Sequence, residues 1–441
     1  MSEIEESSKR WIDEGRAFKT ALNAWLGEIY AGKKPSTDEP EDTREDMADD
    51  VIAYARQLNA EGRADDLRRM FPPAHEPFDY DAIDPYGVQT GQLLLLKDGR
   101  VVTTVYEPEG RRTYVLQGNA ITPVPDVIAI ARSTYHEVYA KAYADRIDVH
   151  ESWDGPAVRS LPWPKGYGGV IEGAEDVFES ASDLGSIETL SIFPDGKRAV
   201  VATESGVFLL EESGSTLLHP SKEQMSEYVD DPEEIDFSLS YAHAAISPDG
   251  ALIAVGVQDP PHVILREHEG AWVPAAEVHP RSSYPHAALF HDAKPHVALA
   301  GCHFAGSATV GLDLGKLPKP GADALVLDGY SGDERLDYID NRFWVFSMAP
   351  LDEGYALGAN NGYIWAHAFD GPEQLWFCHL GSTLTAMDIS EDRSTLVVGT
   401  YSGQVIVLRL DQQRDPGQLI TDRDVREERR WVFWPGGPMA W

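Results

Sequence analysis

The chain has 441 residues, and its 73 acidic against 37 basic side chains give a formal net charge of −36 at pH 7. Such a charge repels nucleic acids and anionic membranes, and it attracts basic partners or cations unless it serves solubility alone. The two cysteines, Cys302 and Cys378, lack metal-binding spacing, which argues against a zinc site or a disulfide scaffold. The acidic N-terminal sequence is unlike a secretory signal, and the apolar runs are too short to cross a membrane. We therefore expect a cytoplasmic protein that binds neither membrane nor nucleic acid.

The N-terminal part of the chain has helical rather than strand-like periodicity. Phe18, Leu22 and Leu26 recur at helical spacing and give one amphipathic face, to which Trp25 and Ile29 also belong. This pattern predicts a first helix that ends before the glycine and proline that follow it.

A second amphipathic segment runs from Met47 to Leu58, and Thr43 with Asp46 predicts its start, because both side chains can accept free amide protons. Pro72-Pro73 marks a boundary. We expect a helical hairpin over residues 1–72 that rests on a second domain over residues 73–441, because so small a unit is not stable alone.

The remainder of the chain repeats one unit of short strands and turns. The sequence Phe193-Pro194-Asp195-Gly196 returns as Ser247-Pro248-Asp249-Gly250, each time between two apolar runs. Asp and Gly tolerate the positive backbone angle of a tight hairpin, so each copy predicts two strands joined by a turn. Repeats of three or four short strands are typical of propeller blades.

Seven such units are expected, so the fold class is mainly β, a seven-bladed β-propeller with an N-terminal helical hairpin. The units lie at Leu93–Leu116, Ile128–Trp153, Ile187–Leu210, Tyr241–Leu265, Tyr284–Leu312, Phe343–Phe369 and Leu384–Leu410.

These units resemble divergent bacterial members of the WD-repeat β-propellers. Trp153-Asp154 stands where that family has its Trp-Asp dipeptide, and Phe369-Asp370 and Leu410-Asp411 are degenerate versions. The family's Gly-His dipeptide before each first strand is missing, so the resemblance implies the propeller without the hydrogen-bonded tetrad that braces family blades.

The C-terminal segment Arg429–Trp434 is strand-like and aromatic. It could supply an outer strand to the last blade or pack against the Trp11 and Trp25 helix face. Trp431, Trp434 and Trp441 are expected to be buried rather than to form an exposed binding patch.

Few residues carry a catalytic pattern, so we expect no enzyme activity, no cofactor and no metal. Gly166-Tyr167-Gly168-Gly169 lacks the lysine and helix of a phosphate-binding loop. His243 and His286 occupy equivalent positions on adjacent inner strands, where they could face each other and bind a divalent metal. A repeated structural hydrogen bond is the other interpretation of this pair.

Acidic residues are concentrated in three connections that are expected to join one blade to the next, at Glu172–Asp183, Glu223–Asp236 and Asp328–Asp340. We expect them to converge on one face, with Phe178, Leu336 and several tyrosines as apolar anchors among the charges. The predicted partner-binding residues are Glu175, Asp176, Glu179, Tyr228, Asp230, Asp231, Glu233, Glu234, Asp333, Glu334, Asp337 and Tyr338.

These features predict a non-enzymatic protein that binds a basic protein partner through an acidic propeller face. The resemblance suggests a sharper hypothesis, an immunity protein that blocks a cognate secreted bacterial toxin. A general interaction scaffold and a metal-dependent propeller enzyme are the alternatives.

Overall fold

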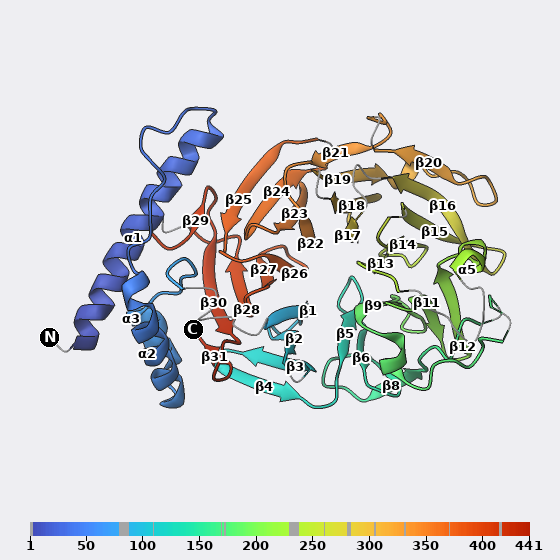
Figure 1. The fold of residues 1–441 in the computed structure, drawn as a ribbon, viewed down its shortest axis with the longest axis horizontal. Coiled ribbons are helices and arrows are strands. Elements are labelled where there is room, and N and C mark those ends of the chain that lie inside the picture. Colours follow the sequence, from blue (N-terminus) through green and yellow to red (C-terminus); the bar gives the residue numbers. More distant parts are fainter. Residues whose placement is uncertain are drawn as a thin grey trace. The chain divides into compact units, whose positions relative to one another are not determined.

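The computed structural model describes most of the chain. The described residues are 3–78, 88–108, 110–168, 170–171, 173–228, 238–259, 261–279, 284–303, 306–329, 332–369, 371–413 and 417–441. Within them the strands form seven sheets of four or five strands, which confirms the predicted seven-bladed β-propeller (Figure 1).

The first four sheets follow the predicted units. In chain order they contain β1 (Gln89–Leu95), β2 (Val101–Glu107), β3 (Gly110–Gln117) and β4 (Ala120–Val124); β5 (Ala129–Arg132), β6 (Tyr139–Ala142), β7 (Ile147–His150) and β8 (Ala157–Leu161); β9 (Ile187–Ile192), β10 (Ala199–Thr203), β11 (Gly206–Glu211) and β12 (Gly214–His219); and β13 (His243–Ile246), β14 (Leu252–Gly256), β15 (His262–His268), β16 (Ala271–His279) and the parallel strand β20 (Leu325–Asp328).

The fifth and sixth sheets, like the fourth, take their outermost strand from a later part of the chain. The last three sheets contain β17 (Tyr284–Phe290), β18 (His296–His303), β19 (Gly306–Asp313) and β21 (Asp337–Asp340); β22 (Val345–Leu351), β23 (Gly354–Ala359), β24 (Tyr363–Ala368), β25 (Gln374–His379) and β29 (Ile420–Thr421); and β26 (Leu384–Ile389), β27 (Thr395–Thr400), β28 (Gln404–Arg409), β30 (Arg426–Val432) and β31 (Met439–Ala440).

The chain divides into two compact units, each with its own core. The first comprises Met1–Val124, Ala356–Ala366 and Gln374–Trp441, and the second comprises Pro125–Tyr355 and His367–Glu373.

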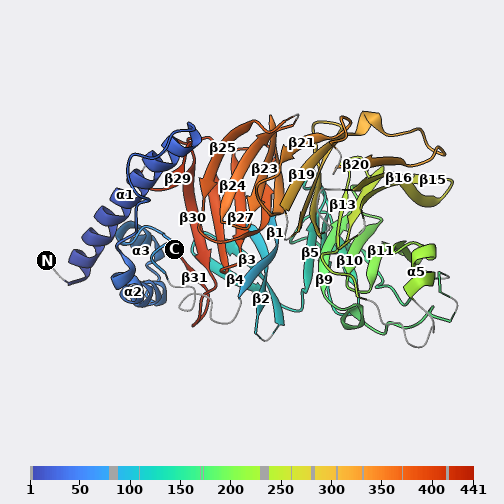
Figure 2. The same ribbon diagram turned by 45° about the horizontal axis from the view of Figure 1, so that its top comes forward.

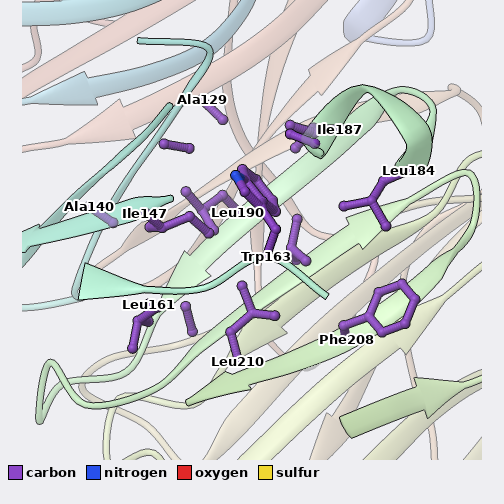
Figure 3. Close-up of a cluster of buried hydrophobic side chains, with 14 of the residues drawn as sticks. Ala129, Ala140, Ile147, Leu161, Trp163, Leu184, Ile187, Leu190, Phe208 and Leu210 are labelled. Carbon is purple, nitrogen blue, oxygen red and sulfur yellow. The ribbon is translucent and has the colours of Figure 1, made fainter. Parts of the chain in front are cut away.

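In the second unit the innermost strands β5, β9, β13, β17 and β22 contact one another in chain order. Hydrogen bonds join β9 to β13, since the Ser191 hydroxyl donates to the Ala244 carbonyl at 3.1 Å and the Ala244 amide donates to the Thr189 hydroxyl at 3.1 Å. The apolar core between the second and third sheets includes Trp163 and Leu190 (Figure 3). Neighbouring blades are therefore held by both packing and polar contacts.

The Pro-Asp-Gly turns are present as predicted. The Asp195 carboxylate accepts from the Lys197 amide at 2.8 Å, and Asp249 accepts from the Ala251 amide at 3.0 Å. Gly196 and Gly250 have φ values of 64° and 70°, the left-handed conformation that favours glycine.

The first unit carries the N-terminal helices α1 (Glu3–Tyr30), η1 (Glu45–Met47), α2 (Ala48–Ala60) and α3 (Ala64–Met70). Helix α1 lies beside β29, and α2 lies beside β31 (Figure 1, Figure 2). The predicted start at Thr43 is wrong: Arg44 precedes the first turn, no side chain caps it, and the Thr43 hydroxyl donates to Glu14. None of the described helices combines the length and the low polarity that a membrane span requires.

The C-terminal segment supplies an outer strand and also packs against Trp11 of the first helix, though not against Trp25. Strand β30 pairs with β28 as an outer strand of the seventh sheet. Trp434 and Trp441 join the core that includes Trp11 and Phe71. Trp431, Trp434 and Trp441 are all buried, as expected.

Candidate functional site

The first acidic connection, between β8 and β9, is an exposed loop that is fixed to the apolar core between the second and third sheets. Its Phe178 amide donates to the Lys165 carbonyl at 2.7 Å. The Phe178 ring packs edge-on against Tyr167, with centroids 5.2 Å apart, and against Phe208, at 6.2 Å. Phe178 is half-buried and anchors the loop internally.

Anchoring of Phe178 leaves its charged neighbours in solvent. Glu175, Asp176 and Glu179 are exposed, as is Val177 at 39%. No hydrogen bond or ion pair of these three carboxylates is found among the described residues. The loop thus presents three unneutralised negative charges together with one apolar side chain.

Gly166 sets the path of this loop. The Tyr167 amide donates to the Ala174 carbonyl at 2.8 Å. A Cβ at position 166 would overlap the Ala174 carbonyl oxygen and would lie 2.5 Å from the Glu175 carbonyl oxygen. The glycine-rich segment 166–169 therefore has a packing role in its first residue, because only glycine leaves room for the loop backbone.

A short 3-10 helix, η2 (Ala181–Leu184), ends the connection. Ser180 and Asp183 form a capping box, in which the Asp183 carboxylate accepts from the Ser180 amide at 2.9 Å and from the Glu179 amide at 2.8 Å. These backbone hydrogen bonds lower the pKa of Asp183 because they stabilise its charged form. Asp183 adds negative charge and also holds the loop in shape.

The end of the first acidic connection and the segment that follows the second one meet at the turn between β10 and β11. The Ser205 amide donates to Leu184 and the Glu204 amide donates to Ser186, both at 3.2 Å. From the other side, the Leu239 amide donates to Glu204 at 2.7 Å.

The turn between β14 and β15 joins the same surface, since the Gln258 amide donates to the Ser240 carbonyl at 2.9 Å. The prediction that inter-blade connections and second-to-third-strand turns share one end of the blades is confirmed here. We call the surface formed by residues 173–186, 204–205, 238–241 and 258–259 the blade 3–4 face.

Part of the second connection lies outside the described residues. Helix α5 (Lys222–Tyr228) begins it, and the side chain of Tyr228 is not described. The predicted residues Asp230, Asp231, Glu233 and Glu234 also lie outside the described residues.

The third acidic connection was predicted wrongly, because Asp328–Asp340 is not a loop from the last strand of one blade to the first strand of the next. It carries the end of β20 and the whole of β21, which are outer strands of two different sheets. Asp337 pairs with Gly311, and its carboxylate lies 3.3 Å from the His296 ring at the start of β18. Asp337 therefore lies toward the opposite end of its blade from the inter-blade connections.

Other predicted residues of this segment are engaged internally. The Asp333 carboxylate accepts from the Arg335 guanidinium at 2.8 and 2.5 Å, and this contact lowers the pKa of Asp333. The Tyr338 hydroxyl donates to the Gly329 carbonyl at 2.8 Å, and Leu336 is buried. Among the described residues of this segment, Asp328 and Glu334 are the exposed carboxylates.

One exposed aromatic residue of the blade 3–4 face was missed. Tyr241 is 49% exposed and has a φ of 56°, an uncommon conformation for a bulky side chain. Its ring meets Tyr284 at 5.3 Å and His286 at 4.9 Å, both nearly at right angles. The available signal was its position between the second acidic run and β13, but sequence alone does not show exposure.

His243 and His286 each contact a residue of their own sheet. The His243 ring is 5.1 Å from that of His262 on the same sheet, whereas His286 lies 2.5 Å from the Cys302 sulfur. Burial lowers the pKa of His286 to about 4 and raises that of Cys302 to about 12, so both are neutral at pH 7. Within the described residues no group of three or more His, Cys, Asp or Glu side chains could hold a metal ion.

The opposite ends of the second and third sheets contrast with the blade 3–4 face. A hollow of about 430 Å³ is found there, and its charges are balanced. Arg159 contacts Glu212, and Arg198 lies 3.8 Å from Asp195. The hollow is lined by Arg159, Asp195, Lys197, Arg198, Glu211, Glu212 and Ser213.

Comparisons with known proteins find similarity to solved structures. No protein-family model and no curated protein matches the chain. One similar solved structure is the β-propeller domain of Cps50 (Swd1) from Myceliophteria thermophila, which is 11% identical with a TM-score of 0.44. The match covers 70% of this chain and 92% of that one.

Proposed function

We propose that the chain is a non-enzymatic propeller that binds a basic protein through the blade 3–4 face. The observation that carries this proposal is the exposed loop with Glu175, Asp176 and Glu179, fixed to the core and continuous with the turn at Glu204. Fixed charges cost less to order on binding than mobile ones, and negative potential speeds the encounter with a cationic partner.

The specific role we propose is neutralisation of a basic secreted toxin by an immunity protein. A toxin that acts on nucleic acid carries a cationic cleft, and an acidic face can occupy such a cleft in place of the phosphates. A general scaffold would instead bind several unrelated partners weakly and with strong salt dependence.

Charge reversal at the face tests the proposal. The triple variant Glu175→Lys/Asp176→Lys/Glu179→Lys should weaken binding to octa-arginine, a defined basic probe, by at least about tenfold. Isothermal titration calorimetry would measure the affinities of the unaltered protein and the variant.

A matched control distinguishes an effect of the blade 3–4 face from an effect of the overall net charge. Glu137, Glu151 and Glu353 are exposed carboxylates in turns at the other ends of the strands of the second unit. Reversal of these three changes the net charge equally. Equal weakening by the two triple variants would contradict a localised site.

A further inference from the structure

On the basis of the proposed function, we infer that Tyr241 is the anchor of the blade 3–4 face and binds a lysine or arginine side chain of the basic partner against its ring. The tyrosine is held in place while half of its surface is open. Tyr284 and His286 lie 5.3 and 4.9 Å from it, at 80° and 88° to its plane. An aromatic ring fixed in this way contributes contact area at little entropic cost.

Hydrogen bonds from two neighbouring turns fix the backbone just before Tyr241. Leu239 donates to the Glu204 carbonyl, and Ser240 accepts from the Gln258 amide. These bonds hold the segment in place while Tyr241 keeps a φ of 56°, which most side chains avoid. A conformation of this kind persists only where the surroundings impose it, and such residues are concentrated at functional sites.

The chemistry around the ring favours a cation. His286, on one side of Tyr241, is neutral because burial lowers its pKa to about 4, so it does not repel positive charge. Phe346 packs on His286 at 4.5 Å and extends the aromatic cluster. The exposed carboxylate of Asp259 and the loop with Glu175 belong to the same face and complement a cationic group. Tyrosine rings attract ammonium and guanidinium groups electrostatically.

Substitution of Tyr241 tests this inference with octa-arginine as the probe and octa-citrulline, which lacks the charge, as its neutral counterpart. We expect Tyr241→Ala to weaken octa-arginine binding about 2- to 30-fold and Tyr241→Phe to leave it within about twofold. Binding of octa-citrulline should be weak to every variant. Tyr241→Gly removes the ring and also relieves the positive φ, so it separates loss of the ring from loss of folding.

Tyr135→Ala is the matched control, because Tyr135 is 46% exposed in the turn between β5 and β6. Tyr135→Ala should bind octa-arginine like the unaltered protein.

Unchanged binding by Tyr241→Ala and Tyr241→Gly, with the Glu175/Asp176/Glu179 reversal still weakening binding, would overturn the anchoring role of Tyr241 and leave the proposed function standing. Binding that neither change affects would refute both. Full affinity in Tyr241→Leu would show an apolar contact and would also overturn the cation-binding role.

Discussion

At the scale of single residues, the path of the acidic loop depends on the lack of a side chain at Gly166. Gly166 has no Cβ, and the loop backbone at Ala174 and Glu175 occupies the space that a Cβ would take. The obstruction involves main-chain atoms, which cannot rotate away as the end of a flexible side chain can.

We expect Gly166→Ala to displace the loop, to lower the free energy of unfolding by about 1–3 kcal/mol and to weaken binding of octa-arginine. Urea unfolding and calorimetry would measure the two effects. Gly306→Ala is the control, since nothing lies within 4 Å of a Cβ there. A Gly166→Ala protein as stable and as tightly binding as the unaltered one would show that the loop path does not depend on this glycine.

Some of these residues could be identified from the sequence and others could not. The turn residues Asp195 and Gly196 were predictable because turn chemistry is local. The roles of Phe178 and Asp337 were not, because whether an aromatic ring or a carboxylate faces solvent depends on strands distant in sequence. Phe178 packs on Phe208, and Asp337 lies beside His296.

At the scale of elements, helix α1 is attached to the segment before β29 by a buried charge. The Lys19 ammonium donates to the Gln418 carbonyl at 2.9 Å and to the Pro73 carbonyl at 3.3 Å. Asn23, one turn later, donates to Leu419 and accepts from the Thr421 amide, both at 2.9 Å. Amphipathic spacing predicted α1, but it could not predict that a lysine would lie on the buried side.

Burial lowers the pKa of Lys19 from 10.5 to about 8. Glu76 and Glu427 oppose this shift, while Arg44 and Arg430 add to it. Between these two pH values the unfolded chain binds the proton more tightly than the folded protein does. The free energy of unfolding that depends on Lys19 therefore rises with pH between about 8 and 10.5. Below about pH 8 the destabilisation caused by burying the charged ammonium is fully present.

We expect the stability of the unaltered protein relative to Lys19→Met to increase between about pH 7 and pH 10. Urea midpoints of both proteins at several pH values would show the trend, and other titrating groups cancel in the difference. Lys9→Met, at an exposed position of the same helix, should show no such trend. A pH-independent difference for Lys19→Met would contradict an ammonium that loses its proton near pH 8.

At the scale of the whole molecule, the repeated units made the propeller predictable. The strands that do not belong to a repeat could not be predicted. Seven units with local turns gave the correct number of blades. The outer strands β20, β21 and β29 lie outside the repeated units. Each of them pairs with a sheet whose other strands come earlier in the chain. The sequence therefore does not reveal that Asp328–Asp340 contains outer strands. Of the acidic residues predicted to bind a partner, the structure places Glu175, Asp176 and Glu179 on the blade 3–4 face.

The central claim is that a basic partner binds at this one end of the blades. Hydrogen–deuterium exchange with saturating octa-arginine would test it most directly. We predict slower exchange in residues 173–186, 204–205 and 238–241, and unchanged exchange in the turns at 133–138, 193–198 and 351–354. Protection confined to those three turns, or spread evenly over the second unit, would contradict the claim.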